Sequence, residues 1–369
     1  MKLLMVDYYG MSDSEGKVLG HSYKVLREYS EMLRNCVDLS LAASPCIISE
    51  WNQRKREQRC DTRTFTKVYA LPYDIQGTGT NSLRKRLSDK VKLFHNLDVV
   101  FQLPDQFDAI WFYRTDFFLF LYIYLHWKKA EYYKMVGLVY HQSFTGGRLE
   151  NVLQRIYRKA LQRLDLVIVT GKEENLMHRN VFRMPDYTYD STEYTIPSVK
   201  KERAVCVGTM NPYKELEELV ESFNRNGYPL YIAGRFTDPE RAICLRTKAS
   251  KNIVIVDRVL SAEEYRDCLS SAKYAVLPYC MHQYENRTSG ILQECAFWAT
   301  IPVAPSKLLR ENNIPGIGYD SWEEMESFPI DVSHNEKIYE EMKRYRRRSD
   351  RKAVSLGLQK AIHGIMDLT

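Results

Sequence analysis

The sequence lacks the features that mark secreted, metal-binding and membrane-spanning proteins. Its eight cysteines form no Cys-x-x-Cys pair and mostly lie in apolar runs, which predicts buried, reduced thiols rather than disulfides or a zinc site. The longest apolar stretch, residues 117–127, is about half of the ~20 residues that span a membrane, and it predicts a core helix. The N-terminal MKLLMVDYYG turns polar too soon for a signal peptide. We therefore expect a cytoplasmic protein.

Glycine is scarce, with 17 in 369 residues, and neither sign of charge is in large excess. A hydrophobic content of 44% and a charged content of 27% are typical of globular proteins and argue against wholesale disorder. The net charge of +6 favours acidic surfaces but is too small to identify a nucleic-acid binder. At roughly 100–200 residues per domain, the length predicts two or three domains.

Apolar and polar segments alternate along residues 1–170 with the spacing of strands and helices. We predict strands at 1–8, 46–49, 66–70, 108–112, 135–140 and 166–169. We predict helices at 21–33 and 149–161, and a third from residue 83, where Leu83, Leu87, Val91 and Phe94 recur at helical spacing. This alternation predicts a mostly parallel sheet with helices on both faces.

A polar stretch with prolines, residues 184–201, interrupts the pattern and is predicted to link two domains. A second series follows, with strands at 204–207, 230–233, 253–256, 274–277 and 301–304 and helices at 216–223, 262–269 and 289–298. The expected fold class is α/β, with two doubly wound Rossmann-like domains that face across a cleft. We place them at 1–195 and 203–335, followed by a C-terminal helical segment at 336–369 that can return to the first domain. Ligands of such sheets bind beyond the carboxyl ends of the strands, beside helix N-termini.

The most informative segment is 279–305, YCMHQYENRTSGILQECAFWATIPVAP, which runs from a strand through a polar loop into a helix. Ser289 and Gly290 stand where that helix begins, so their backbone N–H groups can bind a diphosphate. Glu294 follows on the same helix, where a carboxylate can accept both hydroxyls of a ribose. The alternatives without a binding role are that Ser289 and Gly290 only cap the helix and that Glu294 is an ordinary acidic residue near its start.

This segment resembles the donor site of GT-B glycosyltransferases, in particular the retaining family-four (glycosyl transferases group 1) type. That family usually carries two glutamates separated by seven residues, and Glu294 matches the second. The position of the first is Asn286, and Glu285 lies one residue earlier. The resemblance implies that this pair lies near the transferred sugar, with Glu285 and Asn286 as candidate catalytic residues.

Residues 205–223, VCVGTMNPYKELEELVESF, resemble the segment in which that family holds the donor phosphates with an Arg and a Lys. Lys214 matches the Lys, and Thr209 stands at the Arg position, so Arg235 or Arg287 would supply the second cation. Alternatively, Lys214 is one more exposed lysine. In the first domain, VYHQSF resembles the strand that ends in a catalytic His, here His141. The alternative is a structural role, in which His141 is a histidine at a domain edge with its hydrogen bonds made within the fold. Residues 16–21 stand at the family's glycine loop and imply Gly20 and His21 on the acceptor side.

The resemblance implies a hexosyltransferase that moves a sugar from a UDP- or GDP-sugar to an acceptor hydroxyl, with retention, in polysaccharide or glycoconjugate synthesis. It implies no cofactor beyond that co-substrate. The chain has no Asp-x-Asp motif, which GT-A enzymes use to hold a metal, so we expect metal-independent chemistry. The acceptor would be a glycan or a lipid-linked molecule. A basic helix with Arg84, Arg86 and Lys90 suggests peripheral contact with the inner membrane surface.

Three alternatives stay open at this stage. A sugar-nucleotide epimerase of the same fold would need no acceptor, and a DNA-modifying glycosyltransferase would use the basic run 343–352, which otherwise reads as a solvated helix face. The third is a non-catalytic nucleotide-sugar-binding protein of the same fold, which Thr209 and Asn286 would favour.

Overall fold

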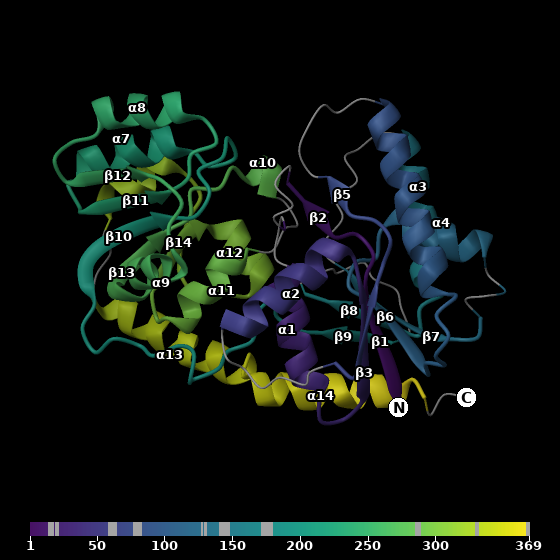
Figure 1. Ribbon diagram of the computed structural model, residues 1–369. Helices are drawn as coiled ribbons and strands as arrows, with labels where there is room; N and C mark the ends of the chain where they lie inside the picture. Colours follow the sequence, from purple (N-terminus) through teal and green to yellow (C-terminus); the bar gives the residue numbers. More distant parts are fainter. Residues whose placement is uncertain are drawn as a thin grey trace. The chain divides into compact units, whose positions relative to one another are not determined.

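A computed structural model describes residues 1–13, 18, 22–57, 65–76, 83–126, 128, 131–139, 148–170, 180–284, 289–328 and 332–366 (Figure 1). The chain divides into two compact units. Unit 1 is Met1–Met184 together with Lys352–Thr369, and unit 2 is Pro185–Arg351. Among the described residues, no helix is both long enough and apolar enough to cross a bilayer. The domain boundaries expected from the sequence stay a prediction.

Unit 1 is built on a seven-stranded sheet in the order β4-β3-β1-β6-β7-β8-β9, in which every pair of neighbours is parallel. Its strands are β1 (Lys2–Asp7), β3 (Asp38–Ala43), β4 (Lys67–Ala70), β6 (Ala109–Phe112), β7 (Lys134–Val139), β8 (Leu166–Val169) and β9 (Val181–Arg183), with a small separate pair β2 (Met11–Ser12) and β5 (Ile75–Gln76). Its helices are α1 (Ser22–Leu33), α2 (Pro45–Glu57), α3 (Leu83–Val100), α4 (Phe117–Leu125), α6 (Arg148–Leu161) and α14 (Arg351–Gly364).

Alternating side chains of the central strands build one core on each face of this sheet. Leu3 and Met5 of β1 join a cluster with residues of α1, α2 and α14, whereas Leu4 and Val6 join a second cluster with residues of α3, α4 and α6. Because successive side chains of a strand point to opposite faces, a fully apolar strand such as LLMV must be covered on both sides. This confirms the predicted parallel sheet with helices on both faces.

The strand predicted at 46–49 is wrong, because these residues lie in α2. The strand is β3, one element earlier in the chain. A short apolar run does not distinguish a strand from a buried helical turn, and here Pro45 supplies the fixed φ that suits a first helical position. Ile47 and Trp51, four residues apart, then bury one face of the helix in the unit 1 core.

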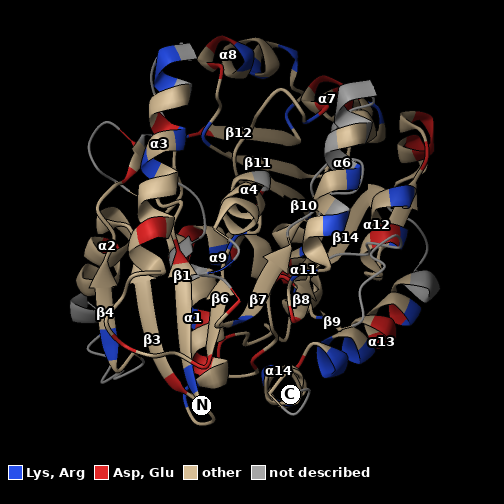
Figure 2. Cartoon of the chain, turned by 90° about the vertical axis from the view of Figure 1, so that its right-hand side faces the viewer, with Lys and Arg blue, Asp and Glu red and all other residues tan. Residues whose placement is uncertain are grey.

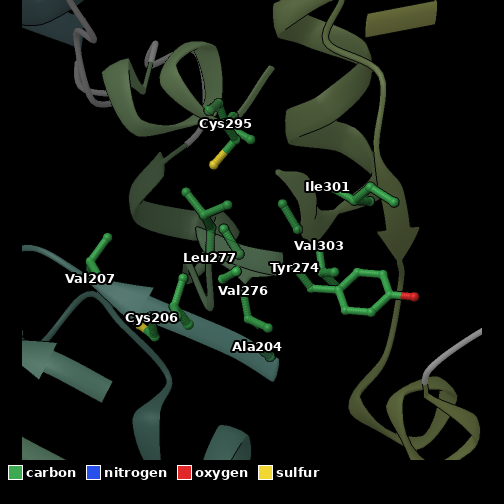
Figure 3. Packing of buried hydrophobic residues seen from close by; sticks show 14 of the residues in the cluster. Ala204, Cys206, Val207, Tyr274, Val276, Leu277, Cys295, Ile301 and Val303 are labelled. Carbon is green, nitrogen blue, oxygen red and sulfur yellow. The ribbon is translucent and has the colours of Figure 1, made fainter. Parts of the chain in front are cut away.

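Unit 2 has a six-stranded parallel sheet in the order β12-β11-β10-β13-β14-β15. The strands are β10 (Lys201–Val207), β11 (Leu230–Gly234), β12 (Ile253–Asp257), β13 (Ala272–Val276), β14 (Ile301–Pro305) and β15 (Ile317–Tyr319). The helices are α7 (Leu216–Asn226), α8 (Pro239–Lys248), α9 (Ala262–Ser271), α10 (Met281–Tyr284), α11 (Gly290–Phe297), α12 (Ser306–Asn312), the 3₁₀ helix η1 (Trp322–Ser327) and α13 (Val332–Arg348). Figure 3 shows part of its core, to which β10, β13, β14 and α11 contribute Cys206, Tyr274, Ile301 and Cys295.

Local sequence signals set several helix ends in unit 2. Ser261 and Glu264 form a reciprocal capping box at the start of α9, and Asp238 caps α8 ahead of Pro239. Gly227 ends α7 in the left-handed conformation at φ 70°. The N-cap residue of α11, Ser289, makes no side-chain capping bond, and the same holds for Glu215 at α7 and Pro305 at α12. The Ser289 side chain therefore caps none of the first backbone N–H groups of α11.

The expected linker and the basic tail take part in packing. Tyr187, Tyr189 and Tyr194 of the stretch after Pro185 pack on the core of unit 2. In the tail, α13 contributes Met342 to that core, whereas α14 contributes Leu358 to the core of unit 1.

Candidate donor site

The carboxyl ends of β10 and β13 form the topological switch point of unit 2. The chain after β10 winds to one side through β11 and β12, and after β13 to the other side through β14 and β15. The loops after the two strands are joined, since Lys214 and Tyr279 form an antiparallel bridge and Glu215 N donates to Pro278 O at 2.7 Å. Parallel α/β sheets bind their ligands at this position.

Two glycines allow the backbone at this switch point to pack closely. Gly208 directly follows β10 at φ 98°, and a Cβ there would lie 3.3 Å from Ile291 Cδ1 and 3.9 Å from Lys214 Nζ. Gly234, at φ 154° at the end of β11, approaches so closely that a Cβ would lie 1.8 Å from Gly208 O. A side chain at either position would strain the backbone, and one at Gly208 would also crowd Ile291 and Lys214. The glycines therefore let the ends of β10 and β11 approach each other closely.

Lys214 is the buried cation of this site. Its side chain is 4% exposed, and Nζ donates to Val207 O at 3.0 Å and lies 3.7 Å from Met210 Sδ. Burial lowers the pKa of Lys214 by disfavouring the charged amine. In the part of the chain that the structure describes, no carboxylate forms an ion pair with it. This overturns the alternative of an exposed surface lysine and leaves a buried amine that an anion would stabilise.

An arginine of the neighbouring helix α8 holds the loop that carries Lys214. Arg241 of α8 donates to Asn211 O at 3.1 Å and to Lys214 O at 2.8 Å. It also pairs with Glu217, which raises the pKa of Arg241 and lowers that of Glu217. The charged pair at the start of α7 therefore fixes the backbone on which the buried lysine sits.

The start of α11 lies beside Lys214. A Cβ on Gly208 would meet both Ile291 of α11 and Lys214, so these two side chains lie at the same point of the switch. The Tyr279 hydroxyl lies 3.2 Å from Ser289 Oγ, and Ser289 is 6% exposed. A Cβ on Gly290 would lie 2.4 Å from Tyr187 Cε2, so only glycine allows this tyrosine ring to pack there. The structure thus brings Lys214, Ser289 and Gly290 together, with the positive end of the α11 dipole next to the lysine.

Glu294 lies one turn further along the face of α11 that starts with Gly290. Its Oε2 accepts a hydrogen bond of 2.6 Å from the Tyr265 hydroxyl of α9. Burial and the neighbouring Glu294 charge raise the pKa of Tyr265, so this hydroxyl stays a donor over the physiological range. The tyrosine fixes the orientation of the carboxylate, and no motif in the sequence pointed to it because α9 and α11 are distant in the chain.

Of the other predicted site residues, the structure describes two, and six lie outside the described residues. Thr209 and Arg235 are exposed, and Met210 N donates to Arg235 O at 2.9 Å, which puts the two loops side by side. Glu285, Asn286 and Arg287 lie outside the described residues, as do His141, Gly20 and His21 in unit 1. Their roles stay predictions.

Unit 1 has its own switch point, between β1 and β6, which the sequence reading missed. Asp7 ends β1 and is 2% exposed, with Tyr9 N donating to its Oδ1 at 3.3 Å. The Arg114 guanidinium, after β6, lies 4.3 Å from the centroid of the Tyr9 ring. The Tyr8 hydroxyl donates to Asp116 Oδ1 at 2.8 Å. The available signal was a charged residue near the end of each apolar strand, since Asp7 ends β1 and Arg114 lies two positions after β6.

No metal cluster is found among the residues that the structure describes. There, no group of three or more His, Cys, Asp and Glu side chains could hold an ion. All seven cysteines within the described ranges are free thiols. Metal-independent chemistry stays a prediction.

The fold is shared with solved structures at low sequence identity. Trehalose-6-phosphate synthase OtsA superposes with a TM-score of 0.68 at 8% identity over 100% of both chains. HepE of Anabaena, solved in complex with UDP and glucose, superposes with a TM-score of 0.64 at 11% identity over 98% of this chain and 99% of HepE. A Listeria monocytogenes protein described as a UDP-N-acetylglucosamine 2-epimerase gives a TM-score of 0.59 at 10% identity, over 100% of this chain and 97% of that one. No protein-family model and no curated protein matches the chain.

These likenesses confirm the expected fold: the chain has the GT-B fold, two Rossmann-like α/β units in one chain. At such identities they establish the fold, and the chemistry has to be argued from the residues of this chain.

Proposed function

We propose that this protein is a GT-B glycosyltransferase that moves a sugar from a nucleotide-sugar donor to an acceptor hydroxyl. The observation that carries the proposal is Lys214, a buried amine at the switch point of unit 2 with no carboxylate paired to it among the described residues. A buried cation is costly unless an anion accompanies it, and the start of α11 beside it also favours negative charge. HepE, of the same fold, was solved with UDP and glucose.

Each residue of the donor site receives a role in this proposal. Lys214 and the N–H groups of Ser289 and Gly290 bind the diphosphate, and Glu294 accepts hydrogen bonds from the ribose hydroxyls. The bond between sugar C1 and the β-phosphate oxygen breaks, a bond from C1 to the acceptor oxygen forms, and the acceptor proton passes to the leaving phosphate. Lys214 stabilises the charge that grows on that phosphate.

Finer features of the reaction follow the family resemblance. We propose a hexosyl donor, retention at the anomeric carbon and no divalent metal, with turnover unaffected by EDTA. The acceptor would be a glycan or a lipid-linked molecule.

The direct test is thermal denaturation with and without UDP, with uridine as the ligand that lacks the diphosphate. At about 100 times its dissociation constant, UDP should stabilise the wild type by ~2.7 kcal/mol. Lys214→Met should abolish most of this stabilisation while leaving any effect of uridine intact. The ligand-free Lys214→Met protein should itself be more stable than wild type by about 1–3 kcal/mol, because a methionine needs no counter-charge.

Lys248→Met is the matched control, since Lys248 is an exposed lysine of unit 2. It should respond to UDP as the wild type does. Equal stabilisation of wild type and Lys214→Met by UDP would show that Lys214 does not bind the diphosphate and would remove the proposal.

The epimerase alternative is kept because of the Listeria neighbour. An epimerase would change the donor sugar without any acceptor, which NMR of the nucleotide-sugar pool detects. A non-catalytic protein would bind UDP and neither transfer nor hydrolyse the sugar.

The DNA-modifying alternative loses its best support. The basic run of the tail is engaged within unit 2: Arg346 donates to Ala296 O at 2.7 Å and Arg348 to Asn313 O at 2.7 Å. Arg351 pairs with Asp190 and Glu193. These contacts favour a packing role for the run.

A further inference from the structure

Three helices on one face of the unit 1 sheet carry large apolar side chains on their outer surface. Leu87 and Val91 of α3 are 61% and 60% exposed, and Tyr124 and Leu125 of α4 are 80% and 59% exposed. On α6, Val152 and Ile156 are 52% and 46% exposed. The inner surfaces of the same helices fill the core, so these outer residues are apolar in excess of what packing requires. We call this surface the three-helix face.

A groove of about 860 Å³ lies between α4 and α6 on this face. Its walls are mainly apolar and aromatic, including Leu121, Tyr124 and Ile156. Lys159 and Arg163 also line it and supply two positive charges. An apolar groove with cations at its edge suits a molecule that has an apolar body and an anionic head.

The outer two of the helices that carry this face are strongly basic in sequence. In sequence, α3 and α6 together hold nine Lys and Arg against three Asp and Glu, a net charge of +6 that equals that of the whole chain. The helix between them, α4, contains no charged residue. Figure 2 shows the uncharged α4 between the basic helices α3 and α6.

We propose that the three-helix face docks on an anionic lipid bilayer. Its basic helices complement the negative surface of such a bilayer, and the apolar side chains of α4 and α6 enter the boundary between headgroups and acyl chains. Tyr124, and Tyr132 at 86% exposure, present a ring and a hydroxyl, which is the chemistry enriched at membrane interfaces. A second copy of this chain fits poorly, because a symmetric contact would bring two strongly basic surfaces together.

This proposal relocates the membrane contact expected from the sequence. Lys90 lies 3.5 Å from the centroid of the Phe118 ring of α4, and burial lowers the pKa of Lys90. Its amine therefore faces the neighbouring helix. Arg84 is exposed at the start of α3, while the side chain of Arg86 lies outside the described set. The exposed contact is now assigned chiefly to α4 and α6, with Arg155 and Lys159 as its cations.

The test is co-sedimentation of the full chain with vesicles, at low and high salt. Wild type should bind vesicles of phosphatidylcholine mixed with phosphatidylglycerol and release them as salt rises, and should bind pure phosphatidylcholine weakly. The face variant Leu125→Ser/Lys159→Glu should lose at least about tenfold in vesicle affinity. The control Ile243→Ser/Lys251→Glu removes an equally exposed apolar residue, 60% against 59%, and one lysine from unit 2, and should bind as wild type does.

Both variants should keep the wild-type circular dichroism and the thermal shift with UDP, so a failure of the donor-site proposal is recognised separately. Wild type that ignores anionic vesicles overturns the docking proposal, as does equal binding by wild type and the face variant. Self-association that the face variant abolishes, without vesicle binding, would also overturn it and assign the face to a second copy.

Discussion

The two switch points of this chain have the same topology and different chemistry. In unit 2, the loop after the central strand β10 delivers a buried lysine, and Gly208 and Gly234 let the ends of β10 and β11 approach each other closely. In unit 1, the central strand β1 ends in a buried aspartate, and Arg114 stacks on a tyrosine ring. Parallel sheets of either unit would place a ligand beyond these strand ends, so the fold sets the location and the side chains decide what binds there.

We infer from this difference that the two units bind complementary ligands. A buried cation beside a helix start selects a diphosphate, whereas a carboxylate with aromatic and guanidinium neighbours suits the hydroxyl groups of a sugar. We therefore expect changes at Lys214 and Glu294 to act on the donor, and changes at Asp7 and Arg114 to act on the acceptor.

The largest effect is expected for Lys214→Ala. Charge grows on the departing diphosphate as the sugar bond breaks, so the lysine stabilises the transition state more than the ground state. Losing such a contact should lower kcat at least ~10²-fold, measured as release of UDP from the nucleotide sugar that gives turnover. Arg114→Ala, the counterpart in unit 1, should act mainly on the acceptor KM. If folded Lys214→Ala keeps a kcat near that of the wild type, the assignment of the donor to unit 2 and the acceptor to unit 1 is wrong.

An intermediate effect is expected for Glu294→Ala. Loss of a charged acceptor for the ribose hydroxyls should weaken UDP binding by about 1–3 kcal/mol, measured by titration calorimetry. Asp7→Asn, an isosteric change in unit 1, should leave the affinity for UDP unchanged. If the two variants weaken UDP binding equally, Glu294 and Asp7 do not act on different ligands, and the proposed difference between the units fails.

Most strands and helices and the main residues of the donor site were predicted from the sequence, and some contacts within the sites were not. Elements with strong periodicity or complete strand runs were confirmed, such as β8 and α7, whose limits follow apolar spacing and a terminal glycine. In the donor site, Lys214 and the start of α11 were predicted and lie together, because each sits next to a recognisable strand–loop–helix.

What escaped prediction depends on contacts between distant segments. The burial of Lys214 follows from the bridge to Tyr279, and the orientation of Glu294 follows from Tyr265, which is 29 residues away in sequence. The helix α2 was taken for a strand because its short apolar run fits either structure. Asp7 and Arg114 were missed because neither belongs to a motif, and only the neighbouring positions of β1 and β6 bring them near one another.

The smallest effect is expected for Tyr265→Phe, and it tests how finely the donor site is built. The Tyr265 hydroxyl donates to Glu294 at 2.6 Å, and its raised pKa keeps it protonated even in alkaline solution. Removing it takes away one hydrogen bond that orients the carboxylate, which should weaken UDP binding by about 0.5–1.5 kcal/mol without changing kcat as Lys214→Ala does. The decisive control is 2′,3′-dideoxy-UDP, which lacks the hydroxyls assigned to Glu294. If Tyr265 acts through Glu294 on the ribose, Tyr265→Phe should weaken the binding of UDP and leave the binding of the dideoxy ligand unchanged. Equal weakening of both ligands would mean that the tyrosine only supports the packing of α9 on α11, and the carboxylate would then reach the ribose without it.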